Sequence, residues 1–460
     1  MPIMKKTTHV ILPWHLAEPL PKDAVTVLLQ DHHLRPGREV LPIHKLKLAW
    51  NMAVCVEFKN SRENKGAAIA IVDWAQVAKL EGPVSVYDPL DHDMYDDLVS
   101  AFGNRLTVFP LVNSFIMGAN DLRDVHENMA KRGGRISGSM RSVSYAKFFK
   151  IVKEKTDTLV GVASTDAENR RPLPRDGLRP SDLPFSNRPG TSAGRTCEAC
   201  AAIVERDYAS SPGSTEQLRH LPITQRDAVR YFELFLDGKL ADYGAYQDAI
   251  DKDSVELYHS HCSHLINAGL LTPEHVIRRV MARKDDIGIS MNNVEGFVRQ
   301  LLGWREYMRF IYHFWGRELK ARMVATGGTP LDFEAWNRAG TGIAPIDGEI
   351  RKVLRHAWSH HIVRLMVFMN FMKLTEVRPL DIYRWFMSLV SLLDAYEWVM
   401  VSNVMAMGYF DRRFMTRHYV SSSKYLLRMS NYEKDGRWDV LWDELYKAYV
   451  AKHGIFGSRA

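Results

Sequence analysis

The chain is predicted to join an N-terminal α/β domain, built on a parallel sheet, to a large all-α C-terminal domain. Short β-branched segments alternate with helical patterns near the N-terminus, and the C-terminal half repeats apolar residues at helical spacing. A Pro- and Arg-rich stretch separates the two textures. With 460 residues, 46% of them hydrophobic, the chain can form two or three domains with sizeable cores. The N-terminal domain is therefore expected to be Rossmann-like.

The first part, residues 1–130, is expected to hold the sheet. Its predicted strands are the β-branched segments HVILP, VTVLLQD, AIAIVDW, VSVYDP and LTVFPL. Helical patterns cover Ile43–Val56 and Asp91–Phe102. No GxGxxG motif follows the first strand, so the usual dinucleotide signature is missing. A ligand of this sheet would lie at the carboxyl ends of the strands.

Residues 131–225 are expected to form an inter-domain connector on the surface. KRGGRISGSMRS is basic and rich in Gly and Ser, and AENRRPLPRDGLRPSDLPFSNRPGTSAGR is rich in Pro and Arg. Cys197 and Cys200 open a helical pattern within it, and a CxxC pair can serve redox chemistry or bind metal. No second pair follows at zinc-site spacing, so we predict two ordinary helical cysteines and no metal ligands.

Residues 226–460 are expected to be helical. The stretch from Asn292 to Glu295 resembles a capping signal. Apolar residues then recur every three or four positions, and the pattern continues through GWREYMRFIYHFWG. This predicts one long helix with an apolar face.

The stretch from Ser359 to Asn403 predicts two packed helices. It begins with the adjacent histidines His360 and His361 and ends near Asp394, with the nearly uncharged MVFMNFM between them. Such a pair could hold a flat cofactor. The alternative is a core helix pair whose polar groups satisfy one another.

A basic run follows, with aromatic residues interleaved. Arg412, Arg413 and Arg417 precede Tyr419 and Lys424. Basic and aromatic side chains together suit a phosphate backbone and a splayed base, whereas the alternative is a solvated loop. The formal net charge of +7 permits a polyanionic partner without establishing one.

Composition limits the cellular setting. Four cysteines and no secretory leader favour a reducing, cytoplasmic location. No apolar run reaches the ~18 residues that a membrane span requires, so no membrane association is expected. The 11 tryptophans and 18 tyrosines can stack on flat ligands or relay electrons, although core packing is their ordinary role.

Several motifs, in the same order along the chain, resemble the photolyase and cryptochrome family. EGFVRQLLGWREYMRFIY looks like the tryptophan–arginine helix of its flavin domain, and YQDA followed by HSHCSHLINAGLL looks like its phosphate-cradling turn. SHHIVRLM and DAYEWVMVSN resemble the two helices around the isoalloxazine. HKLK and DAENR are similar to one branch, the bacterial photolyase-related group that includes iron–sulfur bacterial cryptochromes and (6-4) photolyases.

The resemblance implies a U-shaped FAD in the helical domain. Ser260 and Ser263 would meet the flavin phosphates, and Asn403 would lie near the reactive N5 edge. Asp394 would face the ribityl chain or ring edge, with Arg364 as its salt-bridge partner. The cofactor-binding residues implied in this way are His259, Ser260, Ser263, Gln300, Trp304, Arg305, Arg364, Asp394 and Asn403.

Three departures from the branch stand out. The positions of its four iron–sulfur cysteines fall in Thr341–Pro345, in Asn431–Gly436 and in a deletion before Trp442, so no 4Fe–4S cluster is expected. Where relatives have Trp-Tyr this chain has Trp385 followed by phenylalanine. Electron transfer would then use Trp385 with Trp336 or Trp398, or be weakened. Pro13, Trp14 and His15 replace a Gly-Asp-Gln turn beside the antenna site, so the sequence leaves open whether this chain binds the lumazine antenna of the branch.

The resemblance implies light-driven repair of UV-damaged DNA, with the (6-4) photoproduct as the favoured lesion. Excited reduced FAD would donate an electron, and His360 or His361, with His361 favoured, would act as general acid. Tyr419 would help hold the lesion. The DNA-binding residues expected from the basic run are Arg412, Arg413, Arg417 and Lys424.

Two other functions are compatible with the same fold. A cryptochrome-like blue-light sensor would keep the flavin without repair, and a flavoprotein that has lost its photochemistry is a third reading. The retained histidine pair favours the enzyme, because a sensor needs no general acid. We expect a monomer whose partner is damaged DNA.

Overall fold

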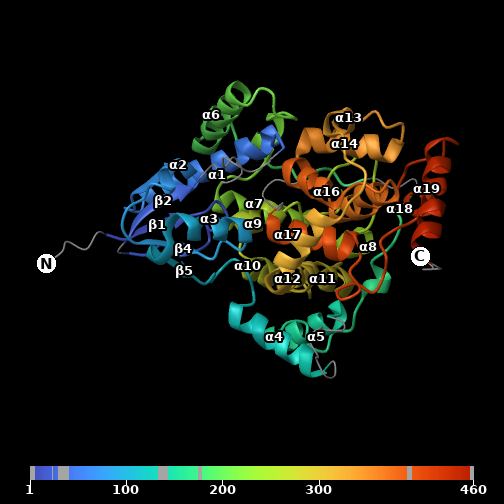
Figure 1. Ribbon diagram of the computed structural model, residues 1–460, viewed down its shortest axis with the longest axis horizontal. Coiled ribbons are helices and arrows are strands. Elements are labelled where there is room, and N and C mark those ends of the chain that lie inside the picture. The colour runs from blue at the N-terminus through green and yellow to red at the C-terminus, as the bar shows by residue number, and fades with distance from the viewer. Residues whose placement is uncertain are drawn as a thin grey trace.

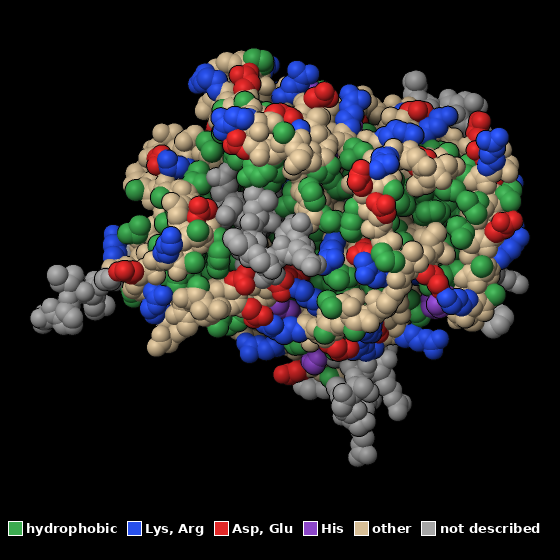
Figure 2. Space-filling model, turned by 45° about the horizontal axis from the view of Figure 1, so that its top comes forward, with side chains coloured by type: hydrophobic (Ala, Val, Ile, Leu, Met, Phe, Trp, Pro, Cys, Tyr) green, Lys and Arg blue, Asp and Glu red, His purple; other side chains and the backbone are tan. Residues whose placement is uncertain are grey.

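The structure is a computed structural model that describes residues 6–22, 24–29, 41–132, 143–174, 179–390 and 396–455. In Figure 1 the sheet lies at one end of the molecule and the last described helix at the opposite end. Among the described residues no helix combines the length and apolarity needed to cross a bilayer. Figure 2 shows Lys, Arg, Asp and Glu side chains interspersed over the face it views.

A five-stranded parallel sheet forms the N-terminal part, in the order β3-β2-β1-β4-β5. All the predicted strands are confirmed: β1 (Thr8–Ile11), β2 (Val25–Leu29), β3 (Ile69–Val72), β4 (Val84–Tyr87) and β5 (Leu106–Phe109). Their β-branched side chains fill the space between the sheet and its helices, and Val10, Val27 and Val86 are buried across neighbouring strands. The order reverses between β1 and β4, which makes that pair the topological switch point.

Helices α1 (Lys45–Glu63), α2 (Trp74–Val77) and α3 (His92–Phe102) alternate with the strands, as predicted. After β5 come α4 (Ala119–Arg132) and α5 (Tyr145–Thr156), and then α6 (Ser192–Asp207). The predicted connector is therefore partly helical, with α6 packed on α1 (Figure 1). Most of the basic Gly/Ser-rich segment, residues 133–142, lies outside the described residues.

All four cysteines belong to the described residues, and all are free and buried. Cys197 and Cys200 face the core from α6, as predicted, and Cys55 lies in α1. Burial raises the pKa of Cys200 to about 11, so the thiol stays protonated at neutral pH. These cysteines act as small core residues.

In the rest of the described chain the regular secondary structure is helical, apart from isolated bridges. Its α-helices are α7 (Gln225–Gly238), α8 (Leu240–Tyr246), α9 (Ser263–Ala268), α10 (Pro273–Met281), α11 (Met291–Val298), α12 (Glu306–Ala325), α13 (Phe333–Asn337), α14 (Ala344–His356), α15 (Asn370–Leu374), α16 (Pro379–Trp385), α17 (Glu397–Val401), α18 (Ser423–Met429) and α19 (Trp438–His453). Wider π-helical turns cover Arg299–Arg305, Val363–Met369, Phe386–Val390 and Ser402–Gly408. The predicted long helix is confirmed as α11, a π-helical segment and α12 in succession.

Two local predictions were wrong. The stretch from Ser359 to Asn403 was expected to form two helices, but its described residues form three helical segments. The break falls at Glu376, whose φ of 54° is left-handed, just before Pro379 starts α16. The capping signal at Asn292 is also displaced, because Ser290 occupies the N-cap of α11 and Asn292 lies buried inside the helix.

Candidate functional site

A cavity of about 800 Å³ lies in the helical part of the molecule. This volume is within the range typical of small-molecule and cofactor sites. Three of the π-helical segments, Arg299–Arg305, Val363–Met369 and Ser402–Gly408, contribute residues to its wall. Such segments often occur at functional sites because the wider turn redirects side chains.

The cavity brings together most of the residues that the sequence singled out. Those in its wall are His259, Ser260, Ser263, Gln300, Trp304, Arg305, His360, His361, Arg364, Trp398, Asn403, Arg417 and Tyr419. As far as the described residues show, the wall does not include Trp336, Trp385, Arg412, Arg413 or Lys424. Asp394 lies outside the described residues.

A buried carboxylate that the sequence analysis missed, Glu256, anchors the turn before α9. It accepts hydrogen bonds from Lys239 Nζ at 2.9 Å, from Tyr231 Oη at 2.8 Å and from His261 Nδ1 at 3.1 Å. Burial opposes its ionisation, but the bonds from His261 and Lys239 hold the pKa of Glu256 well below its usual range. The ionised Glu256 thereby fixes His261, whose φ of 50° is left-handed, next to Ser260.

A second brace uses Asn169 of the DAENR motif. Its Nδ2 donates to the Asn292 carbonyl at 3.1 Å and its Oδ1 accepts from Asn292 Nδ2 at 3.0 Å. On the neighbouring helix, the Gly244 N–H donates to Asn293 Oδ1 at 2.7 Å. These bonds hold α8 against α11 and so fix the segments that carry Gln247 and Gln300 into the cavity.

Arg305 is a half-buried cation in the cavity wall. Its guanidinium lies 4.1 Å from the centroid of the Phe115 ring and 5.2 Å from that of Trp398, and Nη2 donates to Asn267 Oδ1 at 2.9 Å. Nη1 is buried without a hydrogen-bond partner among the described residues. Burial lowers its pKa to about 10, so the group remains charged at neutral pH. A cation with a buried, unpartnered N–H is stabilised by an anionic ligand.

The two adjacent histidines occupy different environments. His360 is buried and stacks on His259 with ring centroids 4.2 Å apart. Burial, and then the neighbouring His259 and His361, lower the pKa of His360 well below its usual range. The His361 side chain is 45% exposed, and its Nε2 lies 3.4 Å from Asp248 Oδ1. His361 is therefore the accessible member, with a carboxylate beside it.

The side chains of His259, His360 and His361 cluster closely, but their ring geometry does not suit a metal ion. One nitrogen from each of His259, His360 and His361 lies within 4.8 Å of the others. The rings of His259 and His360 are only 19° from parallel, so their in-plane lone pairs cannot meet at one ion without ring rotation. Both nitrogens of His259 also face backbone carbonyls, those of Glu256 and Gln247.

No family model matches the chain. A (6-4) photolyase from Agrobacterium fabrum is 33% identical over 308 residues, which cover 65% of this chain and 59% of that protein. The fold resembles a class III photolyase from Agrobacterium tumefaciens, with a TM-score of 0.51 at 17% identity over 87% of this chain and 79% of that one. It also resembles a Synechocystis cryptochrome, with a TM-score of 0.56 at 13% identity over 98% of this chain and 90% of that one. The chain is thus similar in sequence to a (6-4) photolyase over part of that protein's length, and similar in fold to a photolyase and a cryptochrome.

The cavity mouth carries arginines that were not predicted from the sequence to bind DNA. Arg170 and Arg428 line it together with Arg364 and Arg417. Arg413, by contrast, is held in ion pairs with Asp411 and Glu318. Arg412 and Lys424 are exposed. Arg170 lies in the Arg-rich stretch that was interpreted as a surface connector, and Arg428 lies on α18 outside the basic run.

The tryptophans of the expected relay separate into two places. Trp336 and Trp385 lie with ring centroids 5.9 Å apart, and Trp385 Nε1 donates to Asn337 Oδ1 at 3.0 Å. Trp398 lies in the cavity wall, where its ring contacts Phe115. Trp385 and Trp336 are therefore neighbours, whereas Trp398 lies beside Phe115 in the cavity wall.

The crevice at the switch point of the sheet, where a parallel α/β sheet would bind a ligand, is filled by side chains. Trp14 Nε1 donates to the Pro89 carbonyl at 3.2 Å, and His15 Nε2 bonds the Asp88 carbonyl at 3.1 Å. Both rings are buried, and they tie the loop after β1 to the loop after β4. Trp14 and His15 therefore occupy the part of the crevice between these two loops.

The segments where the resemblance implies cluster cysteines hold other contacts here. Asp347 accepts hydrogen bonds from the Thr341 N–H and hydroxyl at 2.9 and 2.7 Å. Tyr432 donates to Glu349 at 3.2 Å, and the buried Trp442 donates to the Ser421 carbonyl at 3.0 Å. The four thiols lie in α1, in α6 and just before α9, so none of them belongs to these segments.

Proposed function

We propose that this chain binds FAD and repairs UV-damaged DNA in the light, with the (6-4) photoproduct as its lesion. One observation carries the proposal. A single cavity joins the half-buried cation Arg305, whose Nη1 is buried without a partner among the described residues, to an accessible His361–Asp248 pair beneath an arginine-lined mouth. The similarity to a (6-4) photolyase supports this class of lesion.

The cavity residues fit the cofactor. Arg305 would hold a negative charge on FAD, since its guanidinium has an unsatisfied Nη1 and no ion pair within the described part of the chain. Ser260 and Ser263 would bind the phosphates at the turn that Glu256 anchors, and Gln300 and Asn403 would offer amides to the ring system. Bound in its reduced form, FAD would supply the electron that opens the lesion under blue light.

The mouth would receive a damaged dinucleotide flipped out of the duplex. A distorted lesion is already poorly stacked, so extruding it costs less than extruding a normal pair. Arg170, Arg417 and Arg428 are exposed at the mouth and would neutralise the flanking phosphates. Tyr419 and Tyr425 line the same mouth and would stack on the extruded bases.

His361 would be the general acid. It is exposed to the cavity mouth, and Asp248 orients the ring and can return a proton to it from solvent. His360 is buried and stays neutral at neutral pH, and its stack on His259 positions the backbone that carries His361. His360 would therefore support the acid instead of acting as one.

Two accessory features of the branch would be missing. The filled crevice at Trp14 and His15 supports a protein without an antenna at that position, and the placement of the thiols supports one without an iron–sulfur cluster. Trp385 and Trp336 would form the electron relay, with Trp398 as a separate group on the cavity wall.

The test is a lesion assay on the purified, flavin-reduced protein. Oligonucleotides carrying one (6-4) photoproduct or one cyclobutane dimer are incubated in the light and in the dark. We expect loss of the (6-4) photoproduct in the light only. Repair of the cyclobutane dimer alone would show that the protein is a photolyase whose substrate is the cyclobutane dimer. No repair of either lesion by a protein that still photoreduces its flavin would contradict the proposal and favour the blue-light sensor.

A further inference from the structure

The loop after β5, residues 110–118, is held by the buried carboxylate of Glu18, which belongs to the loop after β1. Its Oε2 accepts a hydrogen bond from the Val112 N–H at 2.9 Å. Its Oε1 accepts the N–H groups of Asn113 and Ser114, each at 3.0 Å, and the Ser114 hydroxyl at 2.7 Å. One carboxylate thus satisfies three consecutive backbone N–H groups and fixes this stretch of the loop.

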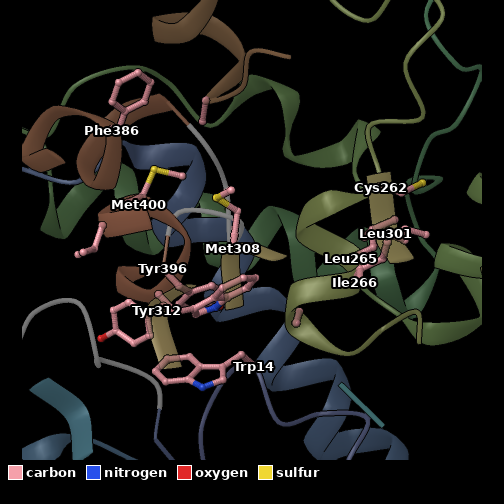
Figure 3. Packing of buried hydrophobic residues seen from close by; sticks show 14 of the residues in the cluster. Trp14, Cys262, Leu265, Ile266, Leu301, Met308, Tyr312, Phe386, Tyr396 and Met400 are labelled. Carbon is pink, nitrogen blue, oxygen red and sulfur yellow. The ribbon is translucent and has the colours of Figure 1, made fainter. Parts of the chain in front are cut away.

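The loop after β1 is itself fixed to the helical part of the chain. Figure 3 shows Trp14, from this loop, beside Tyr396, and the centroids of their rings are 4.9 Å apart. The Leu16 N–H donates to the carbonyl of Ala268, the last residue of α9, at 3.2 Å. Glu18 follows two residues later, so its carboxylate has a fixed position relative to the helices.

Helix α12 holds the next part of the same loop. Glu306, its first residue, is buried and accepts a hydrogen bond from the Ile116 N–H at 2.8 Å. Arg309, about one turn later and also buried, donates from Nη1 to the Met117 carbonyl. The loop backbone is therefore anchored directly before Phe115 and directly after it.

The anchored residue, Phe115, contacts two guanidinium groups. The Cζ atoms of Arg305 and Arg309 lie 4.1 and 4.0 Å from the centroid of its ring, which is buried. The negative face of an aromatic ring attracts a cation, most strongly where water is excluded. Arg309 also lies 3.7 Å from the Glu306 carboxylate, whereas Arg305 has no ion pair in the part of the chain that the structure describes. Arg305 therefore depends more on the Phe115 ring for its placement.

The second ring beside Arg305, that of Trp398, is also fixed from the α/β part. Asp91, just before α3, accepts hydrogen bonds from the Trp398 N–H at 3.0 Å and from the Glu397 N–H at 3.3 Å. The Trp398 ring meets Phe115 edge to face, with centroids 5.4 Å apart, and its own centroid lies 5.2 Å from the Arg305 guanidinium. The α/β part thus holds both aromatic rings that contact this cation.

The Arg305 guanidinium lies close to the turn that is proposed to bind the flavin phosphates. Its Nη2 donates to Asn267 Oδ1 at 2.9 Å, and Asn267 lies on α9 one turn after Ser263. Its Nη1 is buried and has no partner among the described residues. This N–H group is therefore free to bind an anionic ligand of the cavity.

We propose that Phe115 is a positioning residue, which holds the Arg305 guanidinium at the cavity wall with Nη1 available to the pyrophosphate of FAD. Glu18 keeps Phe115 in that place, so the α/β part of the chain contributes to a binding site in the helical part. This role rests on the proposed function, in which Arg305 holds a negative charge of FAD.

A packing role and a positioning role of Phe115 predict different losses of affinity. Loss of packing would weaken the binding of every flavin in equal measure. Loss of the Arg305 position would weaken FAD, which carries the pyrophosphate, more than riboflavin, which carries the same ring system and ribityl chain without phosphate. The ratio of the FAD affinity to the riboflavin affinity therefore reports the position of the cation.

The test measures this affinity ratio by flavin fluorescence on the full chain freed of flavin. Phe115→Leu keeps an apolar side chain but removes the ring, and it should lower the ratio about tenfold. Glu18→Gln should also lower the ratio, because an amide offers one acceptor oxygen where the loop presents three N–H groups and a hydroxyl. Arg305→Gln should lower the ratio at least as far as Phe115→Leu does. Phe115→Leu added to Arg305→Gln should lower it no further, because the two residues act through one contact.

Phe102→Leu provides the matched control. Phe102 is buried in α3, the Arg105 guanidinium lies 5.4 Å from its ring centroid, and it is not among the described residues of the cavity wall. This variant should lose stability in thermal unfolding and keep the wild-type affinity ratio.

A wild-type ratio in Phe115→Leu would overturn the proposal, and so would a loss that persists when Phe115→Leu is added to Arg305→Gln. Glu18→Gln leaves the ring in place and tests the same contact if Phe115→Leu does not fold, and a wild-type ratio in that variant would also count against the proposal. Failure of the proposed function gives a different result, because the wild type would then not bind FAD or Arg305→Gln would keep the wild-type ratio.

Discussion

Replacing Lys373 by methionine should stabilise the protein. Lys373 is a buried lysine in α15 whose Nζ has no hydrogen-bond partner among the described residues, and it lies 6.0 Å from the centroid of the Tyr449 ring on α19. Burial lowers its pKa from 10.5 to about 7. This difference corresponds to about 5 kcal/mol of stability lost at neutral pH, as an upper bound. Methionine keeps the aliphatic stem and removes the amine.

The assay is denaturant unfolding of both proteins at pH 7 and at pH 9.5. The unfolded lysine binds its proton up to pH 10.5 and the folded one only up to about 7, so wild-type stability should rise with pH between these values. The advantage of Lys373→Met should therefore be largest near pH 7 and shrink towards pH 9.5. Lys447→Met, at an exposed position on α19, should change little. This reasoning would be refuted if Lys373→Met unfolded at a lower denaturant concentration than the wild type. It would also be refuted if the gain in free energy of unfolding were the same at pH 7 and at pH 9.5.

Two further predictions concern helix packing and the cavity mouth. Gly244→Ala should destabilise the protein by about 2 kcal/mol, because the added Cβ would lie 2.5 Å from the Asn292 carbonyl oxygen. The control is Gly238→Ala, whose added Cβ meets no atom within 4 Å, and thermal unfolding of the two variants should show a loss of stability only for Gly244→Ala. Arg428→Gln should weaken binding to lesion DNA and lower the magnitude of the slope of log affinity against log salt concentration by about 1. Arg206→Gln, at an exposed position on α6, should leave the affinity and the slope unchanged. Equal slopes for the two variants would show that Arg428 is not part of the DNA interface.

The α/β part could be predicted closely because its signals are local. Each strand is a short β-branched segment bounded by turn residues, and such segments have few other stable structures. The helical part was harder to divide. Apolar residues occur on both sides of Glu376, at Met372 and Val377, so the apolar pattern does not reveal that the helix breaks at Glu376. Pro379 does mark where the next helix begins.

The candidate site could be predicted where motifs were long, as for the turn at Ser260 and the segment at Trp304, which both line the cavity. Supporting residues were missed because their partners are remote. Asp91 bonds a residue 306 positions away, and Glu256 gathers donors from separate helices, so no spacing rule reveals either. Arg428 was missed because an isolated arginine on a helix looks like any solvated charge.

The most direct test of the account compares two neighbouring histidines. Light-dependent repair of a (6-4) photoproduct is measured for His361→Asn and His360→Asn, with flavin content and lesion binding determined on the same samples. The account predicts that His361→Asn lowers the repair rate by about a hundredfold or more with both bindings retained, and that His360→Asn loses less. His453→Asn, remote from the cavity, should match the wild type. Wild-type repair by His361→Asn would contradict the central claim that the accessible histidine at the cavity mouth is the acid.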